Sequence, residues 1–299
     1  MPPSEAVSSP QQVEARRRRL AAKAARRGHA RDGTQQLGRT AKPNRQSTWG
    51  NRPSAQSTRS QVPNRQEYPV IEALLQSLDG LRFEPPVAFV YQPFHYARPM
   101  IERYLERFSQ GTKEVFFLGM NPGPWGMGQT GIPFGAVTAV RRFLVLDEPI
   151  EAPAQQHSQR PIQGLQCRRE EVSGTRFWSW AERRFGSAEA FFQSHFVWNY
   201  CPLLFLDERG RNVPLDKLTR SEQAAIIGPC DIALQSLLAM QQPRTVVGLG
   251  HYASRCLKRC AGDALVLRAQ HPSPANPSAN HGWEEHLDAL LLSAARDID

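Results

Sequence analysis

Three side chains with hydrogen-bonding chemistry stand at the ends of short apolar runs, namely Asn121, Asn199 and His271. An amide offers a donor and an acceptor side by side, and an imidazole can donate a hydrogen bond or carry positive charge. Phe134 follows the rigid Pro133 and can present a flat face for stacking. An asparagine, an aromatic ring and a histidine at strand ends describe a pocket for a planar polar ring.

Each of these residues also has a purely structural alternative. Asn121 can cap a turn, Phe134 can belong to the core, and Asn199 can satisfy buried backbone groups. His271 can belong to a turn, because a proline follows it. The functional interpretation therefore depends on all four side chains meeting at one edge of a sheet.

The segment 119–135 is rich in glycine and contains the spacing G-x-G-x-x-G from Gly126 to Gly131. A dinucleotide-binding loop needs its first glycine directly after the strand and a helix opening at the third. Here the apolar run ends several residues earlier, and Pro133 stands where that helix would begin. We interpret the glycines instead, Gly123 among them, as positions where backbone approaches a ligand closely.

The positioning elements are strand-like and helix-like segments that alternate along the chain. The expected strands lie in 86–93, 114–120, 195–206, 244–250 and 264–272. The expected helices are 68–81, 95–111, 136–146, 173–186 with Ser173 as N-cap, 221–242 with an interruption at Gly228-Pro229, 252–260 and 283–295. Alternation at this spacing predicts an α/β fold with a parallel sheet covered by helices on both faces. Ligands bind such sheets at the carboxyl ends of the strands.

The charge of the chain is concentrated in its first 66 residues. Residues 1–66 carry 14 Lys and Arg against 3 Asp and Glu, whereas 67–299 carry 23 against 25. The first segment has few large apolar side chains, so we expect a disordered basic arm, followed by one folded domain over 67–299. A basic arm attracts nucleic-acid phosphates, and a nuclear-import signal or a solubilising tail is the alternative.

The cysteines and the hydropathy indicate an intracellular protein. Five cysteines, with no secretory signal, favour reduced thiols. Cys256 and Cys260 have C-x3-C spacing without a second pair, so no metal or other cofactor is expected. No apolar run reaches the roughly 18 residues that cross a bilayer. We expect the cytoplasm or nucleoid in a bacterium and the nucleus in a eukaryote.

The segment 271–283, "HPSPANPSANHGW", contains three prolines and two asparagines. Such a segment is stiff and can insert into a groove or a base stack. The alternative is an ordinary turn that leads into the last helix.

Four motifs carry a resemblance to a known family: "GMNPGPWGMGQTGIPFG", "VSGTRFW", "NYCPLLF" and "HPSPANPSANHGW". They resemble the single-strand-selective monofunctional uracil-DNA glycosylases, a branch of the uracil-DNA glycosylase superfamily, over about residues 68–295. The resemblance implies a three-layer αβα sandwich with a central four-stranded parallel sheet. It also implies excision of uracil, and of oxidised uracils such as 5-hydroxymethyluracil, from single- and double-stranded DNA, with no strand cleavage.

The resemblance also implies roles for individual residues. Asn121 matches the asparagine that positions the attacking water, and His271 matches the histidine that stabilises the departing base. Phe134 matches the aromatic residue that stacks on the base, and Asn199 matches the asparagine that reads its edge. The residues expected to line the pocket are Met120 and Gly123. The residues expected to contact DNA are Pro272, Ser273, Pro274, Ala275, Asn276, Pro277 and Asn280.

Two positions depart from the family pattern. Ala275 stands where a basic residue is usual, and its lack of charge shifts the expected preference towards single strands. Trp125 stands where phenylalanine is usual, which keeps an aromatic ring there. DNA is the expected partner, the protein is expected to be a monomer, and no membrane or obligatory protein partner is implied. The alternative function is a nucleic-acid-binding protein whose base pocket has lost catalysis.

Overall fold

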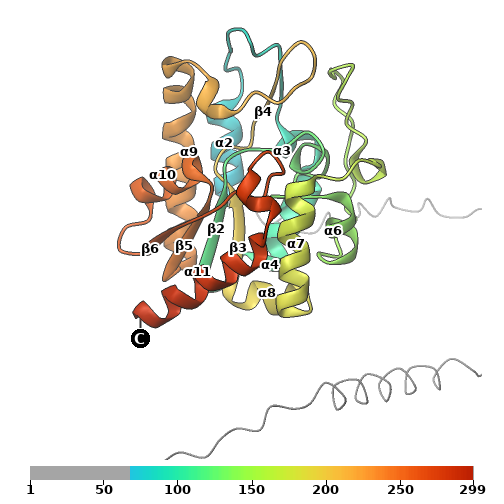
Figure 1. Ribbon diagram of the computed structural model, residues 1–299. Coiled ribbons are helices and arrows are strands. Elements are labelled where there is room, and N and C mark those ends of the chain that lie inside the picture. The colour runs from blue at the N-terminus through green and yellow to red at the C-terminus, as the bar shows by residue number, and fades with distance from the viewer. Residues whose placement is uncertain (1–67, 299) are drawn as a thin grey trace, which may run out of the picture. The chain divides into compact units, whose positions relative to one another are not determined.

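The computed structural model describes residues 68–298, and the side chains of Ser278, Asp297 and Ile298 are not part of that description. The chain divides into two units, Met1–Val62 and Pro63–Asp299. The predicted basic arm, residues 1–66, lies outside the described residues. The described residues all belong to the second unit and are drawn in colour in Figure 1.

A four-stranded parallel sheet forms the centre of this unit, as expected. Its strands are β2 (Val115–Gly119), β3 (His195–Asn199), β5 (Thr245–Leu249) and β6 (Leu265–Ala269). Their order across the sheet is β3-β2-β5-β6, with every neighbouring pair parallel. β3 and β5 are buried along their whole length, which explains their continuous apolar runs.

The α-helices of the described residues surround the sheets. They are α2 (Pro69–Leu78), α3 (Pro93–Tyr96), α4 (Arg98–Phe108), α5 (Met127–Thr130), α6 (Val137–Arg142), α7 (Val172–Phe185), α8 (Ala188–Ser194), α9 (Arg220–Gln241), α10 (His251–Cys260) and α11 (Trp283–Ile298).

The helices form a layer on each face of the sheet, which confirms the three-layer αβα sandwich. Phe117 points to one face, where its ring meets Phe177 and Trp180 of α7 and Phe191 of α8. On the other face α10 packs so closely on β5 that a Cβ on Gly248 would collide with α10 backbone. Figure 1 shows α7 and α11 on the near side of the sheet and α9 and α10 beside it.

The expected strand in 86–93 forms but does not join the main sheet. Within it β1 (Phe89–Tyr91) pairs antiparallel with β4 (Leu204–Leu206) in a separate two-stranded sheet. The expected segment 195–206 therefore holds two strands, because the chain leaves the main sheet after Asn199. Pro202, which has no N–H to donate, lies in the segment that connects them.

Several helix expectations are wrong. The helix α9 runs through Gly228-Pro229 without a break, because burial against α2 and the Thr219–Glu222 capping box outweigh the one backbone hydrogen bond that proline removes. Ser173 lies inside α7, whose N-cap is Glu171. The expected helices included neither α5, which lies inside the glycine-rich loop, nor α8.

No apolar run of about 18 residues was expected, and among the described residues one helix, α9, is nevertheless long and apolar enough on average to cross a bilayer. α9 has 22 residues and an 18-residue window of mean hydropathy 1.3. Core helices of soluble proteins pass the same test, and α9 packs on α2 and α10. All five cysteines are buried free thiols, and the described residues include no group of three or more His, Cys, Asp or Glu that could hold a metal ion.

The Phe117 ring is fully buried between the sheet and α7, so its removal should leave a cavity in the core. We expect Phe117→Ala to lower the free energy of unfolding by about 3–5 kcal/mol. Ile232→Ala is the control, because Ile232 is 63% exposed on α9. Urea denaturation measures both variants, and a Phe117→Ala cost equal to that of the control would contradict this packing.

Candidate active site

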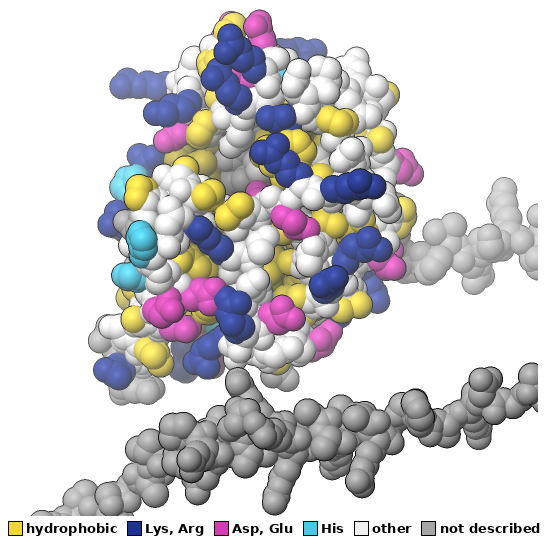
Figure 2. Space-filling model, turned by 45° about the vertical axis from the view of Figure 1, so that its right-hand side comes forward, with side chains coloured by type: hydrophobic (Ala, Val, Ile, Leu, Met, Phe, Trp, Pro, Cys, Tyr) yellow, Lys and Arg dark blue, Asp and Glu magenta, His cyan; other side chains and the backbone are white. Residues whose placement is uncertain are grey.

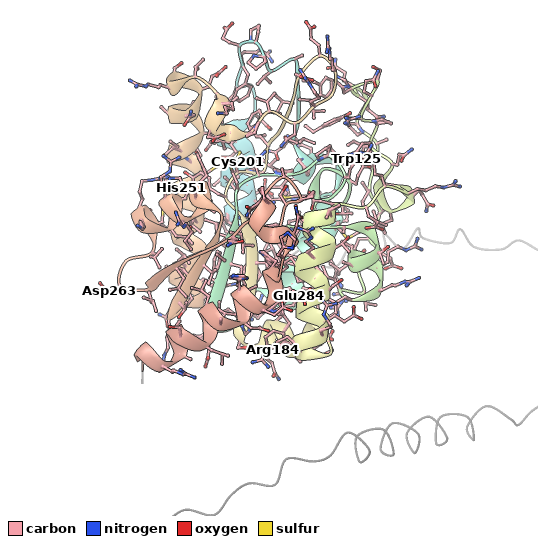
Figure 3. The ribbon with its side chains drawn as sticks, viewed as in Figure 1. Trp125, Arg184, Cys201, His251, Asp263 and Glu284 are labelled. Atoms are coloured by element: carbon pink, nitrogen blue, oxygen red, sulfur yellow. The ribbon has the colours of Figure 1, made fainter. Side chains whose placement is uncertain are left out.

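A cavity of about 180 Å³ opens at the carboxyl ends of the parallel strands. It is lined by Met120, Asn121, Pro122, Gly123, Met127, Phe134, Glu171, Ser173, Asn199, Asn212, His271 and Ser273. Figure 3 labels Cys201, just beyond the end of β3, and Trp125 on this side of the molecule, with Arg184 towards the opposite end. The cavity brings together all six residues predicted for catalysis and base binding.

His271 follows β6 and is held in one tautomer. The backbone N–H of Ser273 donates a hydrogen bond to its Nδ1 at 3.1 Å. Because Nδ1 accepts, the proton of the neutral ring lies on Nε2. Burial lowers the pKa of His271 to about 4, so the ring is neutral at pH 7. Of the two states expected from the sequence, the structure favours the neutral hydrogen-bond donor.

Asn121 leaves β2 with its amide held by backbone carbonyl oxygens. Its Nδ2 donates to the carbonyl oxygen of Leu203 at 3.3 Å and to that of Pro122 at 3.5 Å. Within the described part of the chain nothing donates to its Oδ1. The amide therefore offers an acceptor to a water or ligand in the cavity.

Asn199 ends β3 with its side chain buried, at 4% exposure, beside Gly119 of β2. Its Nδ2 donates to the Met127 sulfur at 3.1 Å, a weak acceptor that a better one can replace. A Cβ on Gly119 would collide with Asn199 Oδ1 and would lie 2.8 Å from the Phe134 ring. Gly119 is therefore required for the amide and the ring to share this space.

The backbone of Phe134 is strained, and contacts with α7 hold the residue in place. Its φ is 53°, a conformation that costs a non-glycine residue about 1–3 kcal/mol. Its ring stacks on Phe177 at 5.3 Å and 21°, and its carbonyl oxygen accepts from Trp178 Nε1 at 3.0 Å. The surrounding contacts thus hold a flat ring beside His271, 6.0 Å between centroids.

The segment after His271 is braced by Arg176 of α7, a residue that the sequence did not single out. Its guanidinium donates to the carbonyl oxygens of Pro272 and Ala279, each at 3.1 Å, and to Asn280 Oδ1 at 2.8 Å. Asn276 Nδ2 donates to the His271 carbonyl oxygen. The two asparagines predicted to contact DNA therefore also hold the segment's own backbone in place.

The segment's exposure is uneven. Pro272 is buried and Ser273 lines the cavity, while four residues form its exposed outer part. These are Pro274, Ala275, Pro277 and Asn280.

Five cavity-lining residues were missed, namely Pro122, Met127, Glu171, Ser173 and Asn212. Glu171 is the chemically distinctive one, because its carboxyl lies where Cβ atoms on Gly123 and Gly126 would be. Burial raises its pKa to about 7. The glycines of the loop indicated that something approaches its backbone closely. That the approaching group is the Glu171 carboxyl could not be known without the fold.

Trp125 lies in the same loop, with two guanidinium groups close to its ring. Arg169 Cζ lies 4.5 Å and Arg160 Cζ 4.9 Å from a Trp125 ring centroid. Such cation–π contacts are favoured most by tryptophan. The departure from phenylalanine thus brings a larger ring into contact with two cations.

The family model and the curated relatives that match this chain belong to the same family of proteins. Residues 106–291 match the model of the uracil DNA glycosylase superfamily. A single-strand selective monofunctional uracil DNA glycosylase from Bos taurus is 43% identical over 227 residues, which is 73% of this chain and 84% of the relative. Its counterpart from Mus musculus is 43% identical over 223 residues, 72% of this chain and 80% of the relative.

A solved structure has the same fold. The wild-type SMUG2 of Pedobacter heparinus matches with a TM-score of 0.53 at 18% identity, over 76% of this chain and 98% of that one. The residues that line the cavity, the match to the family model and the 43% identity over most of the chain all point to the same family. The protein is therefore a member of the uracil-DNA glycosylase superfamily, in the branch of the single-strand selective monofunctional enzymes.

Proposed function

We propose that this protein removes uracil from DNA by hydrolysing the N-glycosidic bond, leaving an abasic site and an uncut strand. The observation that carries the proposal is that Asn121, Asn199 and His271 line one cavity. A base must leave its stack to reach such a cavity, which costs a few kcal/mol in duplex DNA and less in single strands.

Asn199 selects the base. Uracil presents a donor at N3 and an acceptor at O4, and an amide matches both with its Oδ1 and Nδ2. Cytosine presents the opposite pattern there and leaves buried groups unpaired, which can give on the order of 10⁴-fold rejection. Nδ2 gives up only the weak Met127 contact when it turns to O4.

His271 stabilises the departing base. Cleavage places negative charge on uracil O2, and the His271 Nε2–H is the donor that the Ser273 contact leaves facing a ligand. A neutral donor suits this task, since it stays protonated while the base departs as an anion. Electrostatic stabilisation of this kind contributes about 10²–10³-fold for one donor.

Asn121 acts on the water rather than on the base. An amide has no useful basicity, so Asn121 Oδ1 orients the water without taking its proton. The reaction is therefore dissociative, and the base leaves before water adds to the sugar. No cavity-lining residue carries an amine that could attack the sugar, which fits a monofunctional enzyme.

The substrate range extends to oxidised uracils and to both single- and double-stranded DNA. The segment of residues 272–280 would enter the duplex, and the uncharged Ala275 favours single strands. Figure 2 shows Lys and Arg side chains around a hollow on one face, as a DNA surface requires. The protein acts inside the cell. It acts as a monomer, because residues of one chain line the whole cavity.

The alternative of a binding protein with an inactive pocket is less well supported. Such a protein has no need of a histidine fixed with its Nε2–H free, or of an asparagine with its acceptor free. These two features are used only when the bond breaks.

We expect His271→Ala and Asn121→Ala each to lower uracil excision by about 10²–10³-fold, because each removes an interaction that acts in the transition state. Single-turnover excision from a uracil-containing oligonucleotide, followed by alkali cleavage, measures the rate, and DNA affinity should persist. His281→Ala is the matched control, since His281 is exposed. Full activity in either site variant would exclude its assigned role.

We expect Asn199→Asp to relax the preference for uracil over cytosine by at least about tenfold. A carboxylate accepts from the cytosine amino group but cannot donate to uracil O4. Excision from matched oligonucleotides carrying uracil or cytosine gives the ratio. An unchanged ratio would remove Asn199 from base reading.

We expect the His271 ring to titrate near pH 4 and to carry its proton on Nε2 at pH 7. ¹⁵N NMR of the imidazole measures both. The unfolded chain binds this proton at about pH 6.5, so His271 makes the folded state less stable as the pH falls from 6.5 to 4. A titration midpoint at or above 6.5 would contradict the burial of the ring.

A further inference from the structure

The carboxyl group of Glu171 has no assigned task in the reaction described above. Glu171 is the N-cap residue of α7, yet its side chain makes no capping hydrogen bond. Within the described part of the chain its carboxyl makes no hydrogen bond or ion pair with another residue. The adjacent Glu170 differs, because its Oε1 accepts hydrogen bonds from both the N–H and the hydroxyl of Thr138.

The Glu171 side chain lines the cavity, and its carboxyl packs against the glycine-rich loop. Cβ atoms on Gly123 and Gly126 would both collide with it. It also lies close to Gly174, whose Cβ would be 3.0 Å from Oε2. Gly123 and Gly126 thus make room for the carboxyl beside the loop that begins with Asn121. Glu171 is half-buried and its carboxyl is open to the cavity, where a bound group can replace water as its hydrogen-bond partner.

The edge of the base that faces Glu171 can be deduced from the proposed function, on which this inference rests. With His271 at O2 and Asn199 at N3 and O4, these two residues use the three polar positions of the uracil ring. The next ring position after C4 is C5. The wall left for it includes Gly123, where the absence of a side chain leaves a substituent room to reach Glu171.

We propose that Glu171 determines specificity at C5, by accepting a hydrogen bond from the hydroxyl of a 5-hydroxymethyl group and disfavouring the methyl group of thymine. A hydroxyl on C5 can donate to the carboxylate and satisfy it. A methyl group in the same place displaces water from the carboxylate and offers no donor in return, which leaves a buried acceptor unpaired. Uracil, with hydrogen at C5, leaves room for water there.

The ionisation of Glu171 provides a second observable. Burial is the cause that raises its pKa to about 7, so the carboxyl changes charge between pH 6 and 8. The other titratable residue that lines the cavity is His271, with a pKa of about 4, which stays neutral throughout this range. Hydrogen bonds to a carboxylate are roughly twice as strong as those between neutral groups. The preference for a 5-hydroxymethyl group should therefore rise with pH.

The test compares 5-hydroxymethyluracil with uracil in the full-length protein and in Glu171→Gln. The ratio of the two single-turnover excision rates should fall by about tenfold in the variant, since it loses a charge-assisted hydrogen bond. The ratio should also rise from pH 6 to pH 8 in the wild-type protein and stay flat in Glu171→Gln. Glu170→Gln is the matched control, because it changes a neighbouring carboxyl that binds Thr138.

The outcomes separate this inference from the proposed function. A ratio within about twofold of the wild-type value in Glu171→Gln overturns the inference, and so does an equal loss on both substrates. The ratio of dissociation constants for the two free bases tests Glu171 independently of turnover. Absence of uracil excision in the wild-type protein would overturn the proposed function, while the binding ratio would still decide the role of Glu171.

Discussion

The register between β2 and β3 is the constraint on which the site depends. The parallel pairing sets Gly119 beside Asn199, so the amide that reads the base projects over a position without a side chain. A shift of one residue would turn Asn199 to the opposite face of the sheet, away from Phe134. Because side chains alternate along a strand, the same register places Phe117 against α7 on the face that carries the cavity.

The glycines after β2 serve the packing of the protein on itself as much as the approach of a ligand. The space above Gly123 and Gly126 holds the carboxyl of Glu171. Gly128 is needed because a Cβ there would lie 2.8 Å from both the Gly123 carbonyl oxygen and a Leu204 methyl group. The loop thus packs against Glu171 at the start of α7 and against Leu204 of β4, and this density of contacts explains why irregular backbone can be buried there.

Burial acts on the two titratable groups of the cavity in opposite directions. It lowers the pKa of His271 and raises that of Glu171, because a charged form is disfavoured where protein replaces water. The histidine is consequently a neutral donor at pH 7, and the carboxyl is close to its midpoint. A cavity whose histidine is neutral suits a neutral planar base and allows directed hydrogen bonds to dominate recognition.

The sequence alone determined the α/β class, the parallel strands that carry Asn121, Asn199 and His271, and the resemblance to a family through motifs that are local in the chain. Such features depend on periodicity and on contiguous residues. Tertiary structure decided the separate β1–β4 pair, the continuity of α9, the tautomer of His271 and the approach of Glu171 to the glycine loop. Each of these depends on contacts between segments distant in sequence, such as 123 with 171, and no local pattern encodes such contacts.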